Sequence, residues 1–189
     1  MCLLIDVKEQ MPKSNRYGKA KIWTDSDLEQ VLSELDERMR CLFSICLYTG
    51  CRISEARQLR AENIVNDCIV FQSETTKGGK RTRKVEMNET LKTVFGETEL
   101  PATGYLFTGK NGGCITRQTA DAALRKACDL TGLRGYSTHS FRRTALTRLS
   151  NAGVPLRVIQ EISGHADLGV LQKYLEVSPA QVKAAISNI

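Results

Sequence analysis

At 189 residues, the chain is long enough to bury one hydrophobic core and has the size of a single domain. An apolar fraction of 41% and a charged fraction of 25% fit a soluble globular protein. No run of about 18 apolar residues occurs, and the first ten residues lack the apolar core of a signal peptide. We therefore expect a cytoplasmic protein without a membrane span.

The formal net charge is +6, and like charges are clustered along the chain. Residues 24–37 carry six acidic side chains and no basic one, whereas residues 77–84 carry five basic ones and no acid. Residues 131–160 carry five arginines, again without an acid. Such separation favours one positive face that binds a polyanion such as nucleic acid; the alternative is a solvated basic surface without a partner.

The seven cysteines are scattered, form no Cys-x-x-Cys pair and are odd in number. This pattern favours free thiols in a reducing compartment. With only two histidines and no close spacing of ligands, a structural zinc site is not expected.

The N-terminal part is predicted to be an arm followed by helices. Residues 1–21 are expected to form a loose arm or linker, and residues 22–189 one folded domain. Thr24 is a typical N-cap for a first helix. A second helix over residues 38–48 is nearly all apolar, so we expect it at the buried centre, and a short third helix covers residues 53–60.

The pattern then changes to strands. Residues 68–72 and 81–87 are predicted to pair as an antiparallel hairpin around Gly78-Gly79, and residues 105–108 to add a third strand. Helical patterns return over residues 116–129, 139–151, 155–162 and 168–177, and a last helix begins at Pro179. The expected fold is mainly α with one small antiparallel β-sheet, an α+β domain.

Two basic residues follow glycine-containing turns and are candidates for phosphate binding. Arg52 comes after the glycine that ends the second helix, and a planar guanidinium binds two phosphate oxygens at once. The alternative is a surface arginine paired with Glu55. Lys77 lies at the bend of the hairpin, where it could reach a ligand or donate a proton, with a plain basic loop as the alternative and Lys80 as a rival.

Both histidines belong to motifs that suit a phosphate. His139 and Arg142 lie one turn apart on a predicted helix and face the same way, whereas Arg143 is rotated by about 100°. The alternative is a capping histidine with a structural arginine. His165 follows Gly164 just after a helix and could donate to a phosphoryl oxygen, or it could cap that helix.

Tyr174 lies nine residues after His165 and could attack a phosphodiester if enough donors held the phosphate charge. The alternative is ordinary packing of an aromatic side chain in the core. Each candidate alone favours the structural alternative. Together they form one ordered series that ends in a tyrosine.

This series resembles the catalytic domain of the tyrosine recombinases, the phage integrase family, over about residues 20–180. The resemblance rests on the strings TGCRISEARQL, TTKGGKRTRKV, HSFRRTALTRL and ISGHADLGVLQKYLEV. It implies that Arg52 and Arg142 clamp the phosphate and that His165 is a further phosphate donor. It also implies that His139 accepts or relays the proton of the tyrosine, that Lys77 is the general acid and that Tyr174 is the nucleophile.

The same resemblance implies a site-specific recombinase that cleaves and rejoins double-stranded DNA through a 3′-phosphotyrosyl intermediate, without metal, ATP or another cofactor. Phage-encoded or bacterial origin and a homo-tetramer on DNA are implied as well, with a monomer in free solution. Five basic side chains are expected to contact DNA: Lys80, Arg81, Arg83, Lys84 and Arg143.

The chain departs from the family pattern in three places. Ser163 stands where leucine is usual before the Gly-His pair, and Glu86 stands where proline is frequent. Residues 1–21 are too few for the helical DNA-binding domain that usually comes first, so we expect a fragment or a natural single-domain protein.

Two other functions stay open on the sequence. A type IB topoisomerase would use a similar pocket to nick, swivel and reseal one duplex. A non-catalytic module would grip the DNA backbone with the basic hairpin and the arginine-rich helix.

Overall fold

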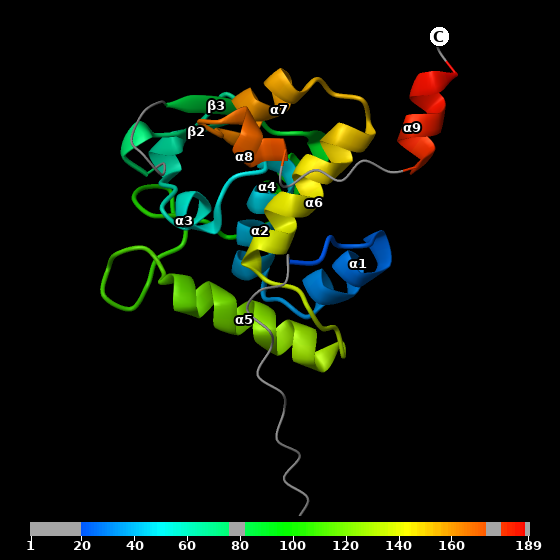
Figure 1. The fold of residues 1–189 in the computed structure, drawn as a ribbon. Helices are drawn as coiled ribbons and strands as arrows, with labels where there is room; N and C mark the ends of the chain where they lie inside the picture. Colours follow the sequence, from blue (N-terminus) through cyan, green and yellow to red (C-terminus); the bar gives the residue numbers. More distant parts are fainter. Residues whose placement is uncertain (1–19, 76–81, 173–178, 188–189) are drawn as a thin grey trace, which may run out of the picture.

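The computed structural model describes residues 20–75, 82–172 and 179–187 (Figure 1). Nine α-helices are described: α1 (Asp25–Ser33), α2 (Glu37–Thr49), α3 (Ile53–Ala56), α4 (Glu89–Glu97), α5 (Arg117–Leu130), α6 (Thr138–Asn151), α7 (Leu156–Ser163), α8 (Leu168–Gln172) and α9 (Pro179–Ile186). The strands are β1 (Ile64–Val65), β2 (Cys68–Phe71) and β3 (Arg83–Glu86), with short 3-10 turns η1 (Ala61–Asn63) and η2 (Ser73–Thr75). The predicted α+β fold is confirmed.

Helix α2 forms the buried centre, as its apolar sequence predicts, and packs between α6 and α4. Phe43 of α2 and Phe141 of α6 are fully buried, and their rings stack with centroids 4.7 Å apart. Burying apolar side chains of this size is the main stabilising contribution to the fold. The α2–α6 contact therefore fixes the start of α6, which carries His139 and Arg142.

The helix boundaries follow local capping chemistry. The hydroxyl of Thr24 accepts a hydrogen bond from the backbone N–H of Asp27, as predicted for the N-cap of α1. Gly50 ends α2 with a φ of 62°, a left-handed conformation that glycine adopts without strain. This turn delivers the chain directly to Arg52. The third helix ends at Ala56, earlier than expected.

The sheet has the order β1-β2-β3, and both pairs are antiparallel. The pairing of β2 with β3 confirms the predicted hairpin, whose bend lies outside the described residues. The third strand was predicted wrongly: it is β1, joined to β2 through Asn66 and Asp67, which have φ values of 49° and 59°. Residues 105–108 instead make single bridges at Tyr105 and Thr108.

Helix α4 was not predicted. Asn88 caps it by accepting a hydrogen bond from the backbone N–H of Leu91, and Leu91 is fully buried against the core. The helix packs on α2. In the described ranges, no helix has the length and apolar character needed to cross a membrane.

The chain enters the domain along α6. Of the predicted arm, the structure describes Ala20 and Lys21, and the backbone N–H of Lys21 donates to the carbonyl of Gly135. Trp23 is 3% exposed, and its ring stacks on Tyr136 with centroids 3.7 Å apart. Ala20 and Lys21, which the predicted arm includes, therefore contact the segment that leads into α6 and α6 itself.

Candidate active site

Arg142 lies near the start of α6 and is 3% exposed. Its Nη1 donates to two backbone carbonyls, of Gly50 at 2.6 Å and of Ser163 at 3.0 Å. These carbonyls lie at the C-terminal ends of α2 and α7, where the partial negative charge of each helix favours a cation. Arg142 thus joins the ends of three helices at one point.

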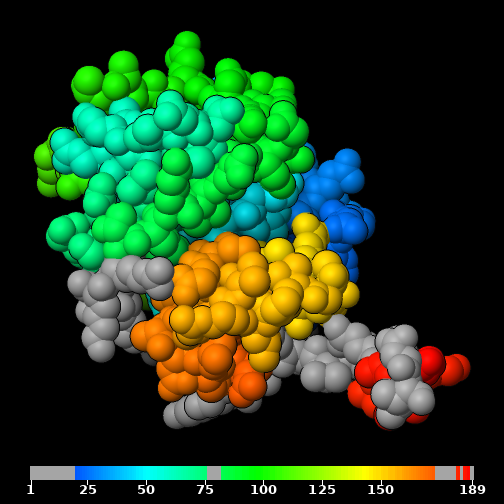
Figure 2. All heavy atoms as spheres, turned by 90° about the horizontal axis from the view of Figure 1, so that it is seen from above, coloured from blue at the N-terminus to red at the C-terminus, as the bar shows by residue number. Residues whose placement is uncertain are grey.

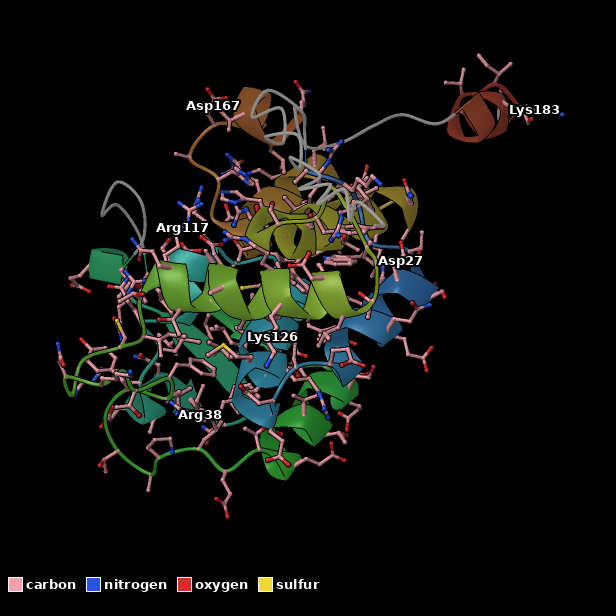
Figure 3. All side chains as sticks on the ribbon, turned by 90° about the horizontal axis from the view of Figure 1, so that it is seen from below. Asp27, Arg38, Arg117, Lys126, Asp167 and Lys183 are labelled. Carbon is pink, nitrogen blue, oxygen red and sulfur yellow. The ribbon has the colours of Figure 1, made fainter. Side chains whose placement is uncertain are left out.

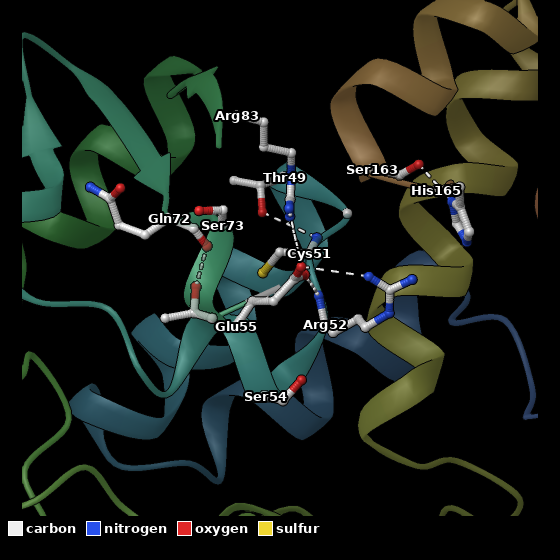
Figure 4. Close-up of polar contacts among 12 residues, drawn as sticks. Thr49, Cys51, Arg52, Ser54, Glu55, Gln72, Ser73, Arg83, Ser163 and His165 are labelled. Carbon is white, nitrogen blue, oxygen red and sulfur yellow. Dashed lines mark hydrogen bonds and ion pairs between the residues drawn. The ribbon is translucent and has the colours of Figure 1, made fainter. Parts of the chain in front are cut away.

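His165 lies directly against this guanidinium and is 5% exposed. The Nη2 of Arg142 is 3.1 Å from Nδ1 and 2.9 Å from Nε2 of His165. Nδ1 is also 2.7 Å from the hydroxyl of Ser163 (Figure 4). Burial, followed by the charges of Arg142, Arg52 and Arg83, lowers the pKa of His165 to about 3, so the imidazole is neutral at pH 7.

Arg52 is the N-cap residue of α3, and its side chain is 27% exposed. Its backbone N–H donates to Glu55 at 2.7 Å, while its Nη1 lies 3.5 Å from the other carboxylate oxygen. Nη1 is buried and makes no hydrogen bond within the described residues. The structure therefore contains the pair with Glu55 that was considered as the alternative, and it still leaves the guanidinium with donors for an anion.

Glu55 is fully buried beneath the arginines and was considered in the sequence only as a surface partner. It receives two hydrogen bonds from Arg83, both at 3.1 Å. Burial alone would raise the pKa of Glu55, but the hydrogen bonds and charge of Arg83, the backbone N–H of Arg52 and the charge of Arg142 lower it. One carboxylate thus lies among three guanidiniums, so the cluster keeps a net positive charge. Figure 4 shows Arg52 and Arg83 beside Glu55.

Arg83 does not fit its predicted role in DNA contact. It is 9% exposed, and besides Glu55 its Nε donates to the carbonyl of Ile162 at 3.1 Å. Its guanidinium lies over the ring of Phe71, 4.2 Å from the centroid. A Cβ on Gly164 would come within 2.9 Å of Nη1 of Arg83, so only glycine lets the two segments approach this closely. Arg83 ties β3 to α3 and to the end of α7.

Arg143 does not fit its predicted DNA contact either. It is 7% exposed, and its Nη1 donates to the carbonyl of Ala20 at 2.6 Å. The rotation of about 100° from Arg142 turns this side chain toward the N-terminal segment. Arg143 therefore holds the start of the domain on α6.

His139 lies one turn before Arg142 on α6 and is exposed. Partial desolvation, and then the charges of Arg117, Arg142 and Arg52, lower its pKa, while Asp121 opposes the shift. Arg117 stands at the start of α5 (Figure 3) and was not singled out in the sequence. The neutral imidazole that results at pH 7 has an acceptor nitrogen, as a proton acceptor requires.

The remaining candidates are placed only in part. Lys84 is exposed on β3, next to the buried Arg83, and is available to a ligand. Four candidates lie outside the described residues: Lys77, Lys80, Arg81 and Tyr174. The structure thus brings together Arg52, Arg142 and His165, with His139 beside them.

The electrostatics of this cluster favour an anion. Burial, and then the charge of Arg52, lower the pKa of Arg142 to about 10, which leaves it protonated at pH 7. Crowded cations with a single buried carboxylate are stabilised when an anion binds between them. A phosphate group with several oxygens fits the donors that the two arginines and the histidine present.

The model of the phage integrase family matches residues 21–181, which is most of the chain. The chain belongs to this family. The tyrosine recombinase XerD of Corynebacterium glutamicum is 31% identical over 157 residues, which cover 78% of this chain and 51% of that protein. The chain spans about half the length of the curated relatives it matches first.

Solved structures share the fold. The XerA recombinase superposes with a TM-score of 0.73 at 20% identity, covering 94% of this chain and 66% of XerA. The XerH site-specific recombinase, bound to its difH substrate in a pre-cleavage complex, gives a TM-score of 0.68 at 23% identity, covering 88% of this chain and 53% of XerH.

Proposed function

We propose that the chain is the catalytic domain of a site-specific DNA recombinase in which Tyr174 cleaves and rejoins DNA strands. The observation that carries the proposal is the convergence of Arg52, Arg142 and His165 in a chain of the phage integrase family. Tyr174 attacks a phosphodiester, forms a 3′-phosphotyrosyl link and releases a 5′-hydroxyl. Attack of a 5′-hydroxyl on this link then rejoins the strands and frees the tyrosine.

Each step places a demand that the cluster can meet. A free phenol has a pKa of about 10, so its proton must pass to a base, and neutral His139 supplies an acceptor. The phosphorane formed on attack carries extra negative charge. Fixed donors such as Arg52 and Arg142 can each contribute about 3–4 kcal/mol to its stabilisation. Lys77 is proposed to protonate the departing 5′-oxygen.

Double-stranded DNA is the proposed partner. Support comes from the net charge of +6, from exposed Lys84 beside the site and from the DNA-bound XerH structure. Lys80 and Arg81, in the same hairpin as Lys84, are proposed to contact the backbone of the DNA near the scissile phosphate.

A homo-tetramer on DNA is proposed as the active assembly. Helix α9 lies apart from the body of the molecule (Figures 1 and 2). Its Val182 and Ile186, one turn apart, are 54% and 64% exposed. Apolar side chains on an isolated helix are covered at low cost by a neighbouring subunit, so a second copy on the same DNA is the proposed occupant.

The proposal is tested with nicked duplexes that tile the DNA flanking the gene. In such a substrate the fragment with the 5′-hydroxyl diffuses away after cleavage, so the protein stays bound covalently. The wild-type chain is expected to form an adduct, Tyr174→Phe none, and Tyr105→Phe as much as the wild type. An adduct that survives Tyr174→Phe contradicts the proposal, and its absence from all proteins favours a DNA-binding module.

A second assay separates the recombinase from a topoisomerase. Supercoiled plasmid that lacks the target site is expected to stay supercoiled. Relaxation without site preference, and without recombinant product, would favour the type IB topoisomerase instead.

A further inference from the structure

Ser163 stands at the last position of α7, fully buried, two residues before His165. Its Oγ lies 2.7 Å from Nδ1 of His165 and 3.4 Å from the carbonyl oxygen of Gln160 (Figure 4). A leucine, usual here in the family pattern, has no polar atom to offer the ring. The hydroxyl therefore adds a specific contact to the imidazole of the candidate site.

The direction of this hydrogen bond follows from the single proton of the hydroxyl. Hydrogen bonds from a hydroxyl to oxygen span about 2.5–3.0 Å, so the carbonyl of Gln160, at 3.4 Å, is a poor acceptor. That carbonyl also accepts the backbone N–H of Gly164 at 2.9 Å. If Nδ1 carried the ring proton, the buried hydroxyl would lose its only well-placed acceptor among the described residues, at a cost in free energy.

Arg142 leaves this arrangement undisturbed. Its Nη2 lies at nearly the same distance from Nδ1 and Nε2, 3.1 and 2.9 Å. An atom in the ring plane cannot satisfy both distances, because Cε1 stands between the two nitrogens, so Nη2 lies over the face of the ring. An atom over the face of the ring does not lie in the in-plane direction of Nε2.

We propose that Ser163 donates to Nδ1 and thereby holds His165 in the tautomer with its proton on Nε2, the tautomer that donation to a phosphoryl oxygen requires. Ser163 is thus a positioning residue, since it acts through the histidine. The effect of Ser163 on DNA cleavage rests on the proposed function. The tautomer of His165 does not, because it can be measured in the free protein. It also explains how a neutral imidazole can serve as a phosphate donor.

The tautomer is measured directly by NMR of the free protein labelled with ¹⁵N on histidine. The chain has only two histidines, and His139→Gln assigns both sets of signals. The result expected for His165 at pH 7 is protonated Nε2 and unprotonated Nδ1. A ring protonated on Nδ1, with Ser163 as acceptor, overturns the proposal.

Variants then test the part played by the hydroxyl. Ser163→Ala is expected to raise the population of the Nδ1–H tautomer and to slow adduct formation by about three- to tenfold, the usual effect of one hydrogen bond. Ser163→Cys is close in size to the wild type and has a weaker donor. Its tautomer population and its rate of adduct formation are expected to lie between those of the wild type and Ser163→Ala. Ser44→Ala removes another buried serine hydroxyl, from α2, and is expected to change neither readout.

These readouts separate the two proposals. The expected tautomers could be observed while the wild-type chain forms no adduct. This result would support the role of Ser163 in holding the tautomer of His165 and refute the proposed function. Adduct formation with an unchanged tautomer in Ser163→Ala would refute the role of Ser163 alone.

Discussion

At the scale of single residues, the pocket depends on the carboxylate of Glu55, whose burial the sequence does not predict. The spacing of Arg52 and Glu55 predicts only an ordinary pair three residues apart. Glu55 is important because it also binds Arg83. Arg83 is 28 residues away in the sequence and reaches Glu55 because the hairpin folds over α3. The motifs with a backbone turn or a helical repeat could be predicted, whereas this contact depends on tertiary structure.

The same reason explains the two DNA-contact assignments that do not fit. Arg83 and Arg143 lie in basic segments, and a count of charges cannot tell which side of a strand or helix each side chain occupies. Along β3 the burial alternates, so Arg83 is buried while Lys84 is exposed. Glu55 and Arg83 are therefore expected to determine stability more than DNA affinity.

Glu55→Gln is predicted to destabilise the fold by about 3 kcal/mol, because it leaves a guanidinium 8% exposed without its countercharge. Urea unfolding of the free protein measures this loss. Glu89→Gln breaks the exposed pair with Lys92 and serves as the control, with an expected loss below about 1 kcal/mol. Equal, small losses in both variants would show that the buried pair is not required.

His165 is predicted to make stability depend on pH. Its pKa is about 3 in the fold and about 6.5 in the unfolded chain, so only the unfolded chain takes up a proton between these values. The free energy of unfolding therefore falls as pH decreases below about 6.5, by roughly 1.4 kcal/mol per pH unit. Unfolding at pH 7 and pH 5 should differ by about 2 kcal/mol more in the wild type than in His165→Gln. The same pH dependence in both proteins would contradict the assigned pKa.

At the scale of elements, local chemistry predicts most boundaries. Thr24 and Thr116 cap α1 and α5, and Gly50 ends α2, because each effect depends on neighbours in the sequence. The misplaced strand had a local signal as well. Asn66 and Asp67 tolerate the positive φ that a two-residue hairpin turn requires, so the run before them could have been recognised as β1. Asn88, the N-cap residue of α4, could likewise have indicated the start of this helix.

The close approach of α7 to β3 leads to a prediction with a matched control. An alanine in the left-handed conformation of Gly164 costs about 1–2 kcal/mol in backbone strain. Gly164→Ala is expected to destabilise the fold by more than this, because the new Cβ would also displace Arg83. Gly153→Ala has a similar φ of 76° but nothing within 4 Å, so only the strain should remain. Thermal or urea unfolding compares the two. Equal losses would mean that Arg83 moves aside freely.

At the scale of the whole molecule, α9 is predicted to drive assembly on DNA. Replacing both Val182 and Ile186 with serine removes the exposed apolar surface of the helix and should leave the pocket intact. The mass of the protein–DNA complex, measured by light scattering, is expected to fall from that of a tetramer to smaller species. Val65→Ser, at another exposed valine, controls for a general loss of apolar surface. An unchanged mass would assign assembly to other surfaces.

Tyr174 is proposed to form the covalent link to DNA, and mapping the linked residue decides whether it does. The trapped adduct is digested with nuclease and trypsin and analysed by mass spectrometry. The peptide of residues 174–183 contains a single tyrosine, so the modified residue is read without ambiguity. We expect a nucleotide joined through its 3′-phosphate to Tyr174. A nucleotide on Tyr48, Tyr105 or Tyr136, or a link through a 5′-phosphate, would contradict it.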